Sequence, residues 1–350
     1  MMEDEQHLIR ATIQRIVKSY EDPVRRGNIT WDPDLWRALA EAGMTGVGPS
    51  ESVGSSGGSV KDAVAIVRIL ASNMAALPVA EHLLVAAPAM SIGGMPLPSL
   101  DQPLTIALAG VSATKEADSW IFSGISADVP WATVSHAIAV VADSSVGASL
   151  AIVPTEEVSV TSQTNIADEP RDSVRFDCVP ASSVAQLTTA QVEELQACFA
   201  ICRAVQLSAA LDQILKWSAQ YVGERHQFGR ALAQFQAIQM NLAIMAGEVA
   251  AVDALVSAAV RALDSGSDKL LLAAAAAKVR AGAAVEVVAR IAHQVHGAIG
   301  FTEEFHLHYL TKRCWSWRDE GGGERMWSQV LGSGLFCEGG DLWPVITNVL

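Results

Sequence analysis

The sequence has few aromatic side chains and few positive charges for a chain of 350 residues. Aromatic residues make up 6% of it, and 24 lysines and arginines stand against 38 aspartates and glutamates, a formal net charge of −14. A chain this acidic repels phosphate backbones, so we expect no nucleic-acid partner. An anionic ligand would need a local cluster of arginines, lysines or backbone N–H groups, because the overall charge does not attract it.

Cysteine is also scarce, and no pair has the Cys-x-x-Cys spacing of metal or redox sites. The segment Met1–His7 is acidic and polar, so we expect no signal peptide. The longest apolar stretch, Ala197–Leu211, is interrupted by Arg203 and falls short of the roughly 18–20 residues of a membrane helix, so we expect no membrane partner. The odd number of cysteines indicates reduced core thiols in a cytoplasmic protein. These cysteines are Cys178, Cys198, Cys202, Cys314 and Cys337.

Several common catalytic and nucleotide-binding motifs are missing from the sequence. Gly46–Glu51 lacks the third glycine of a dinucleotide-binding loop, and there is neither a P-loop nor a Gly-x-Ser-x-Gly elbow. The pairs His293 with His296 and His306 with His308 lack the spacing of a His-Glu-x-x-His metal site. We therefore expect no metal, and histidines that line or cap helix ends.

Apolar periodicity divides the chain into three regions: residues 1–103, 104–185 and 186–350. The first region has apolar residues at helical spacing. The helices expected in it lie within 4–45, over Val60–Leu77 and over Val79–Ala87. The second region alternates short Val-, Ile- and Thr-rich runs with turns, which predicts a small antiparallel sheet. Its expected strands are Thr105–Leu108, Ser119–Phe122, Ala137–Val141, Leu150–Val153, Val158–Val160 and Ser173–Phe176.

The third region is rich in alanine and leucine and predicts a bundle of long helices. Thr188 and Gln191 have the spacing of a capping box at its start. Helices this long and apolar are typical of packing on several sides, including against another subunit, so we expect an oligomer built as a dimer of dimers. The four expected helices cover 188–223, 235–264, 268–296 and 304–318. The fold class is therefore mainly α with a small β domain.

A turn after the first of these helices gathers two arginines, an aromatic ring and an amide, in Glu224–Arg230 followed by Phe235–Gln239. A guanidinium can bind a pyrophosphate, and an aromatic ring can pack on a flat ligand. The alternative is an ordinary helix corner in which Arg225 pairs with Glu224.

Two further segments are candidates for ligand binding. Gln294–Phe301 ends a helix at Gly297, where backbone N–H groups can bind phosphate oxygens or where the helix simply stops. Trp317–Arg325 places Glu320 beside three glycines that let a ligand approach closely. The alternative for this third segment is a flexible acidic loop.

Together the three segments resemble the acyl-CoA dehydrogenase family. ERHQFGR with FQAIQ is similar to the family's ERxxFGxxL and FQ element, and QVHGAIGF is similar to its QxxGGxGF element about 70 residues later. Asp319–Gly321 falls where the family often has Tyr-Glu-Gly, and Leu35–Gly43 with the Gly-rich loop after it also looks like the family. The resemblance implies the family's order of an N-terminal helical domain, a middle β domain and a C-terminal four-helix bundle.

The resemblance also implies a reaction, the FAD-dependent α,β-desaturation of an acyl-CoA thioester with an electron-transfer flavoprotein as acceptor. Glu320 would be the base that removes the α-proton, and Gly321 would offer a backbone N–H to the thioester carbonyl. The implied cofactor-binding residues, which include contacts from across a dimer interface, are Arg225, Phe228, Gln236, Gln294, Val295, His296, Gly297, Ala298, Trp131, Gly322, Gly323 and Glu324.

The chain departs from the family's pattern at several points. Ala298 stands in place of the second glycine of the QxxGG element, three glycines follow Glu320, and the β region lacks the family's Thr-Glu-Pro and Ala-Gly-Ser stretches. Short, divergent members in actinobacterial and steroid-degrading systems are often one half of a two-subunit enzyme. Two alternatives therefore stay open: a non-catalytic partner subunit that completes a flavin site on a homologous chain, and a flavin oxidase or monooxygenase on the same fold.

Overall fold

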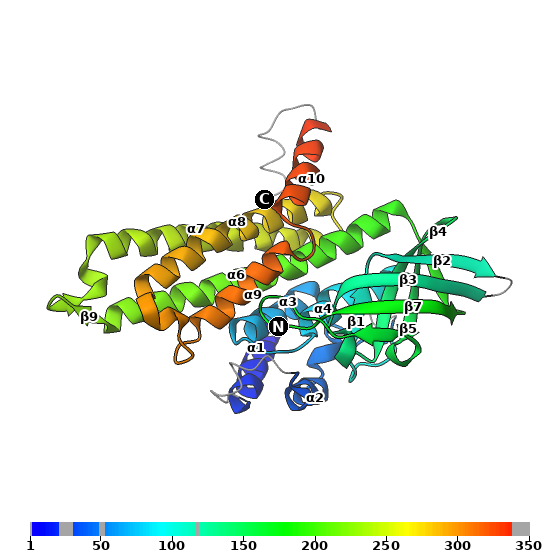
Figure 1. Ribbon diagram of the computed structural model, residues 1–350, viewed down its shortest axis with the longest axis horizontal. Coiled ribbons are helices and arrows are strands. Elements are labelled where there is room, and N and C mark those ends of the chain that lie inside the picture. The colour runs from blue at the N-terminus through cyan, green and yellow to red at the C-terminus, as the bar shows by residue number, and fades with distance from the viewer. Residues whose placement is uncertain (1, 21–30, 49–52, 117–118, 338–350) are drawn as a thin grey trace. The chain divides into compact units, whose positions relative to one another are not determined.

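The computed structural model describes residues 2–20, 31–48, 53–116 and 119–337 (Figure 1). The chain forms two compact units, and the division between them falls inside one helix, between Cys202 and Arg203. Among the described residues, unit 1 comprises residues 2–20, 31–48, 53–67, 76–116 and 119–202, and unit 2 comprises residues 68–75 and 203–337. The sequence predicts three regions whose boundaries differ from those of the two units, and this three-region division stays a prediction.

The N-terminal region is helical, as its apolar spacing predicts. Its helices are α1 (Met2–Ser19), α2 (Pro33–Glu41), α3 (Val60–Ser72) and a continuous helix made of α4 (Val79–Glu81), the π-helical turn η3 (His82–Ala86) and α5 (Ala87–Ile92). Asp32 caps α2, since its carboxylate accepts a hydrogen bond of 3.0 Å from the Leu35 N–H. The chain leaves α2 through Gly43, whose φ of +73° is the left-handed conformation that glycine adopts without strain.

Helix α3 is shorter than the expected Val60–Leu77. It ends at Ser72 because Met74 adopts a left-handed φ of +56°, which no α-helix continues through. The Asn73 side chain closes the end by donating to the Ile69 carbonyl at 2.8 Å. The Asn73 side chain therefore donates to a carbonyl at the helix end that the next turn of the expected helix would otherwise have bonded.

The middle region is a sheet of eight strands in the order β6-β7-β3-β2-β4-β5-β8, with β1 beside β4. The strands are β1 (Leu104–Ala107), β2 (Val111–Glu116), β3 (Ser119–Pro130), β4 (Ala137–Ser144), β5 (Gly147–Pro154), β6 (Ser159–Thr161), β7 (Arg171–Ala181) and β8 (Val184–Leu187). The other strand pairs are antiparallel, as expected, but β4 pairs in parallel with β1 and β2, so the sheet is mixed. The β2–β3 hairpin lies between β1 and β4 in the chain and brings β4 back in the same direction as β1.

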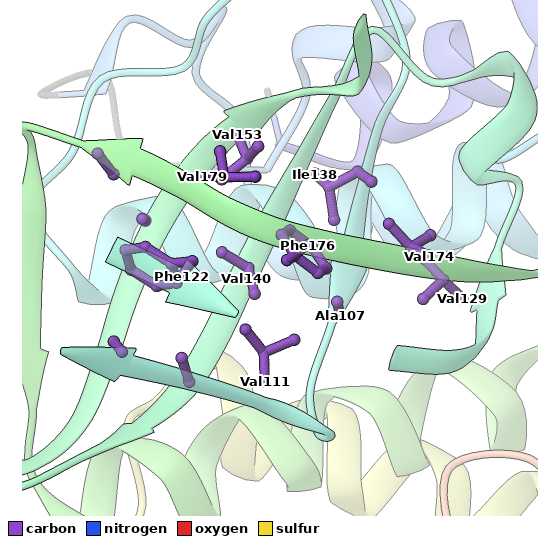
Figure 2. Packing of buried hydrophobic residues seen from close by; sticks show 14 of the residues in the cluster. Ala107, Val111, Phe122, Val129, Ile138, Val140, Val153, Val174, Phe176 and Val179 are labelled. Carbon is purple, nitrogen blue, oxygen red and sulfur yellow. The ribbon is translucent and has the colours of Figure 1, made fainter. Parts of the chain in front are cut away.

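Two strands escaped the prediction because they lack an apolar run. Strand β2 reads Val-Ser-Ala-Thr-Lys-Glu and buries alternate residues only at its start, and β8 has four residues of which one is buried. The core of the sheet is built by the inward residues of the other strands, with Phe122, Ile138 and Val140 at 0% exposure and Phe176 at 2% (Figure 2). This core supplies the apolar burial that holds the sheet together.

The cysteines follow the expectation with one correction. Cys198, Cys202 and Cys314 are buried, but Cys178 on β7 is exposed. The register between β3 and β7 shifts beside Cys178, whose φ is +52°, and such a bulge turns a side chain away from the core. The side chain of Cys337 lies outside the described residues.

The C-terminal region begins with α6 (Thr189–Glu224), a helix of 36 residues. The expected capping box is confirmed, because the Thr188 N–H donates to Gln191 Oε1 at 2.9 Å and the Gln191 N–H donates to Thr188 Oγ1 at 3.3 Å. The other elements are β9 (His226–Gln227), β10 (Arg230–Ala231), α7 (Gln236–Asp264), α8 (Leu270–His296), η7 (Gly297–Phe301), α9 (Leu307–Asp319) and α10 (Glu324–Cys337). Helix α10 was not predicted.

Helix α8 is the centre of this part of the chain and packs against α7, α9 and α10 (Figure 1). The alanine tract Ala273–Ala277 lies in its first turns, and four of its five residues are almost fully buried. Side chains this small let helices approach closely, as expected from the composition.

Helices α6 and α7 are long and apolar enough to cross a membrane by length and composition alone, a test that core helices of globular proteins also pass. In α6, 78% of the apolar window is buried within the protein, whereas in α7 only 39% is buried. Helix α7 therefore leaves apolar surface uncovered in the single chain, including Met240 at 60% and Ile244 at 48% exposure.

A buried histidine joins the helical and sheet parts of unit 1. His82 in η3 is fully buried, its Nε2 lies 3.0 Å from the Thr45 carbonyl, and its Nδ1 accepts a 3.0 Å bond from the Leu104 N–H at the start of β1. These partners require the neutral ring with the proton on Nε2. Burial lowers the pKa of His82 to about 4, since a charged ring would lose its hydration.

This histidine predicts a loss of stability in acid. Below the ordinary pKa of 6.5 the unfolded chain takes up a proton that the folded His82 refuses, so the unfolding free energy falls as the pH drops from 6.5 towards 4. The loss at pH 4 is about 3 kcal/mol relative to pH 7. His82→Gln, which cannot titrate, should flatten this part of a urea-unfolding profile against pH, whereas His136→Gln at an exposed site should not. Parallel profiles for wild type and His82→Gln would contradict it.

Candidate active site

The turn after α6 is a tight two-stranded hairpin. Strands β9 and β10 pair Gln227 with Arg230, and the two residues between them, Phe228 and Gly229, have φ values of +54° and +80°. Two left-handed residues in succession are typical of a type I′ turn, in which the second position suits glycine and the first does not suit phenylalanine. The turn therefore presents an aromatic ring at a position where the backbone conformation is costly for it.

The Phe228 ring lies on the surface and is 91% exposed. The Phe228 ring contacts the Phe235 ring edge to face, with 6.2 Å between the ring centroids. The Arg230 guanidinium lies over the Phe235 ring, 4.1 Å from its centroid. Arg225 and Gln236 are exposed at the same corner. An exposed aromatic ring among guanidinium and amide groups can contact a flat anionic ligand at this corner.

The second segment lies at the end of α8. Gln294 is exposed, whereas the side chains of Val295 and His296 are buried. The helix stops at Gly297, whose φ is +63°, and Ala298 is exposed just after it. The side chains of Val295 and His296 are therefore covered, and the FAD contacts expected of these two residues would be made by their backbone atoms.

These two segments, about 70 residues apart in sequence, come together in unit 2. Tyr221 in the last turn of α6 stacks on His296 with 4.6 Å between ring centroids, and its hydroxyl donates to the His296 carbonyl at 3.4 Å. His296 Nδ1 lies 2.7 Å from the Ala292 carbonyl, and burial lowers the pKa of the ring, so the neutral form fits this place. The corner and the end of α8 thus form one surface.

The histidines near this surface pair with neighbouring side chains. His293 Nε2 lies 3.0 Å from Thr311 Oγ1 and its ring stacks on Phe301 at 4.3 Å, and the His308 ring lies 3.8 Å from the Tyr309 ring. Among the residues that the structure describes, no three His, Cys, Asp or Glu side chains gather as a metal site would need. These histidines line the ends of α8 and α9.

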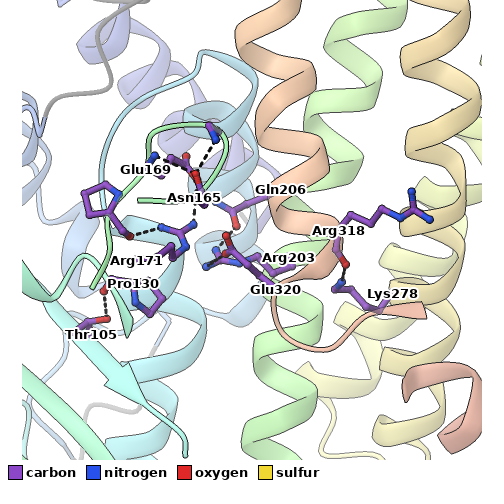
Figure 3. Close-up of polar contacts among 12 residues, drawn as sticks. Thr105, Pro130, Asn165, Glu169, Arg171, Arg203, Gln206, Lys278, Arg318 and Glu320 are labelled. Atoms are coloured by element: carbon purple, nitrogen blue, oxygen red, sulfur yellow. Dashed lines mark hydrogen bonds and ion pairs between the residues drawn. The ribbon is translucent and has the colours of Figure 1, made fainter. Parts of the chain in front are cut away.

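The third segment joins α9 to α10 and is held at Glu320. Glu320 follows the last residue of α9, and its Oε2 lies 2.7 Å from Nη2 of Arg203 on α6 (Figure 3). The Arg203 side chain is 0% exposed and that of Glu320 is 16% exposed. Arg203 Nη1 also donates to Gln206 Oε1 at 2.6 Å. Removing one partner of such a buried pair typically costs about 3–5 kcal/mol, so this contact anchors the segment.

A buried lysine adds a second positive charge to this pair. Lys278 on α8 donates from Nζ to the Arg318 carbonyl, and burial lowers the pKa of Lys278 to about 8 although Glu324 and Glu320 oppose that shift (Figure 3). The sequence pattern missed this group. Arg203 was visible only as an interruption in an apolar helix, and Lys278 as one residue of an alanine-rich helix.

Trp327 holds the first two glycines after Glu320, whereas a Cβ on the third, Gly323, would meet nothing within 4 Å. Trp327 Nε1 donates to the Gly321 carbonyl at 2.7 Å, and a Cβ on Gly322, whose φ is +89°, would lie 2.6 Å from the same nitrogen. Glu324 begins α10, pairs with Arg318 and lies where a Cβ on Gly282 would collide with it. These contacts favour a fixed segment over the alternative of a flexible acidic loop.

Trp131, an expected cofactor contact, lies at the end of β3. It is only 2% exposed, at a left-handed φ of +56°, and its backbone carbonyl accepts from Ser135. The contact of this residue with a flavin stays a prediction.

Comparison with known proteins agrees with this architecture. The sequence matches "Acyl-CoA dehydrogenase, N-terminal domain" over residues 3–94 and "Acyl-CoA dehydrogenase, C-terminal domain" over residues 192–330. Acyl-CoA dehydrogenase IpdE2 of Mycolicibacterium smegmatis is 24% identical over 322 residues, which cover 89% of this chain and 93% of the relative.

Solved structures share the fold over nearly the whole chain. A variant of the Tcur3481-Tcur3483 steroid ACAD has a TM-score of 0.87 at 25% identity, covering 97% of this chain and 99% of that one. The ChsE4-ChsE5 complex from Mycobacterium tuberculosis has a TM-score of 0.84 at 22% identity, covering 95% and 96%. The two matched domains lie on either side of the sheet in the sequence. The chain therefore belongs to the acyl-CoA dehydrogenase family of oxidoreductases.

Proposed function

We propose that the chain carries out an FAD-dependent α,β-desaturation of an acyl-CoA thioester, with Glu320 as the base. The observation that carries the proposal is the place of Glu320. It lies within the matched C-terminal domain, at the end of a buried helix, on a segment fixed on both sides, and it keeps 16% of its side chain exposed. A carboxylate held in this way can meet an α-carbon in one defined geometry.

The neighbouring residues would prepare this proton transfer. Glu320 removes the α-proton, and negative charge then grows on the thioester oxygen, where the Gly321 N–H can stabilise it. Trp327 fixes the Gly321 peptide through its carbonyl, so the donor needs little reorganisation. When bound, FAD would accept the hydride that leaves the β-carbon, and an electron-transfer flavoprotein is the proposed final acceptor.

The exposed surface at the end of α6 and α8 has the groups that the FAD pyrophosphate and rings need. Arg225 supplies a guanidinium, Phe228 a flat apolar face, and Gln236 and Gln294 supply amides, all of them exposed. The backbone at Gly297 can add N–H groups where the helix ends. Gly322, Gly323 and Glu324 stay proposed neighbours of the flavin, with the carboxylate of Glu324 already bound to Arg318.

A second candidate is a partner subunit that completes a flavin site on a homologous chain. Two observations favour it. The Glu320 carboxylate is already bound to the Arg203 guanidinium, a contact that a base would have to loosen to reach a substrate. The titles of two similar structures name pairs of chains, ChsE4-ChsE5 and Tcur3481-Tcur3483. An oxidase on the same fold would differ from both candidates by consuming O₂ without another acceptor.

We predict that Arg225→Ala weakens FAD binding by about tenfold or more, because it removes a charge-assisted contact to the pyrophosphate. The measurement is the flavin-to-protein ratio of the purified assembly and the Kd of reconstituted FAD. Arg261→Ala, an exposed arginine at the far end of α7, serves as the control and should change neither. An unchanged flavin ratio in Arg225→Ala would remove this residue from the site.

We predict an obligate oligomer, a dimer of dimers formed by the chain alone or with a homologous chain. Uncovered Met240 and Ile244 on α7 supply the apolar surface, and obligate interfaces bury about 2,000 Å² or more. Ile244→Glu should therefore shift the mass measured by light scattering towards smaller species. A monodisperse wild-type monomer at micromolar concentration, with no homologous chain bound, would contradict the prediction.

We predict that Glu320→Gln slows acyl-CoA-dependent flavin bleaching by about 10²–10⁴-fold while FAD stays bound, since the amide cannot accept the proton. Stopped-flow absorbance of the assembly measures the rate, and Glu286→Gln at an exposed site on α8 controls for loss of charge. Bleaching at the wild-type rate in Glu320→Gln would assign the base to another chain and leave the partner-subunit candidate.

A further inference from the structure

Lys278 is a charged residue in an otherwise apolar stretch of α8. Its side chain is 1% exposed, and the buried residues around it in the sequence are Ala274, Ala275, Ala277 and Ala281. Burial lowers its pKa from 10.5 to about 8, so the folded chain binds the proton more weakly than the unfolded chain does. Below pH 8 this difference destabilises the folded state relative to an exposed lysine. A gain in stability therefore does not explain why a lysine lies here.

The amine of Lys278 binds the end of α9, two residues before Glu320. Its Nζ donates to the Arg318 carbonyl, which belongs to the last turn of α9, where carbonyls lack partners within the helix (Figure 3). The Glu320 N–H donates to the Ser316 carbonyl at 3.2 Å and so continues the helical pattern to Glu320 itself. A positive charge here also faces the negative end of the helix dipole. The place of the Glu320 backbone therefore depends on where Lys278 holds α9.

The same face of α8 holds the other end of this segment. Gly282 lies one helical turn after Lys278, and a Cβ on Gly282 would lie 2.5 Å from Glu324 Oε1. Glu324 therefore lies against the backbone of α8, and its carboxylate is bound to Arg318. Helix α8 thus contacts the segment on both sides of Glu320, through an amine before it and a glycine after it.

The charges that act on Lys278 attract it to this segment. They belong to Glu324, Arg203, Glu320 and Asp319. The Arg203 guanidinium is paired with Glu320, and Arg318 is paired with Glu324. On α7, which also packs against α8, Glu248 is paired with Arg280 of α8. Three carboxylates against one guanidinium hold a charged amine towards the end of α9 more firmly than they would hold a neutral one.

We propose that Lys278, in its charged form, is the positioning residue that sets the place of Glu320 for proton removal. It acts through the Arg318 carbonyl and the charges of the segment, without touching the substrate. This inference rests on the proposed function of Glu320, which it deepens by naming the group that holds the base. No bond-forming step is added to the desaturation. Since the charge of Lys278 is lost near pH 8, its hold on α9 weakens there, although the neutral amine can still donate.

The test measures the limiting rate of flavin bleaching by the assembly with a series of straight-chain acyl-CoA thioesters, and the Kd of each thioester. Lys278→Met removes both the donor and the charge, so the rate should fall about 10²-fold, which a displacement of about 1 Å can cause. The Kd should stay within a factor of about three, because the lysine is not a binding group. Lys216→Met, at an exposed site on α6, is the control and should match wild type.

Two readouts distinguish positioning from a general effect on folding. The wild-type rate should fall as the pH rises through about 8, whereas Lys278→Arg keeps its charge and should lose this dependence. Lys278→Met should lack it too, at its lower rate. The urea midpoint of Lys278→Met at pH 7 should be no lower than that of wild type, since the variant buries no charge at this position. A residue with a structural role alone would lower rate and midpoint together.

The outcomes separate this inference from the proposed function. A wild-type rate in Lys278→Met, a fall near pH 8 that persists in Lys278→Met and Lys278→Arg, or a urea midpoint that drops with the rate would each overturn the inference. If Glu320→Gln slows bleaching as expected and Lys278→Met does not, the proposed function stands without the inference. If Glu320→Gln bleaches like wild type, or no thioester bleaches the wild-type flavin, the proposed function fails and the inference fails with it.

Discussion

The ion pair between Arg203 and Glu320 is the contact around which the proposed site is organised. It joins the middle of α6 to the end of α9 at 2.7 Å, and the guanidinium is fully buried. Two further contacts hold the segment after Glu320: Trp327 donates to the Gly321 carbonyl, and Glu324 at the start of α10 pairs with Arg318. The same ion pair fixes the position of the Glu320 carboxylate and occupies the group that the proposed function assigns as the base. Arg203 therefore bears on both the structure of this segment and its proposed chemistry.

Much of the fold could be predicted from the sequence, since long apolar periods, capping residues and glycines act locally. The capping box at Thr188 and Gln191 and the left-handed Gly43 behave as their spacing indicates. The parallel pairing of β4 with β1 and β2 could not be predicted, because strand direction depends on how the chain between them folds back. Helix α3 ends early for an equally local but less visible reason, the positive φ of Met74.

The candidate site could be predicted in part, because some of its residues lie on short local motifs. Exposed Arg225, Phe228 and Gln294 stand on short motifs whose residue types already suggest a ligand, and the structure brings those motifs together through Tyr221 and His296. The charged partners of Glu320 were missed because they lie on other helices, at distances in sequence of 117 residues for Arg203 and 42 for Lys278. A buried cation inside an apolar helix was the one available signal.

The surfaces left uncovered by the single chain fit an assembly. Phe228 and the exposed face of α7 lie on unit 2, and both are apolar surfaces that a second chain or a bound cofactor would cover. Whether that second chain is identical or homologous decides between a self-sufficient enzyme and a two-subunit one. Both arrangements use the same helix ends, so the difference lies in which chain supplies the base.

The central claim is the proposal that Glu320 is the base that removes the α-proton of an acyl-CoA thioester. The most direct measurement is a crystal structure of the flavin-loaded assembly with a non-reactive acyl thioether of CoA. The account predicts the α-carbon of the ligand within about 3.5 Å of the Glu320 carboxylate. An α-carbon bound beside a carboxylate of another chain, and away from Glu320, would contradict it.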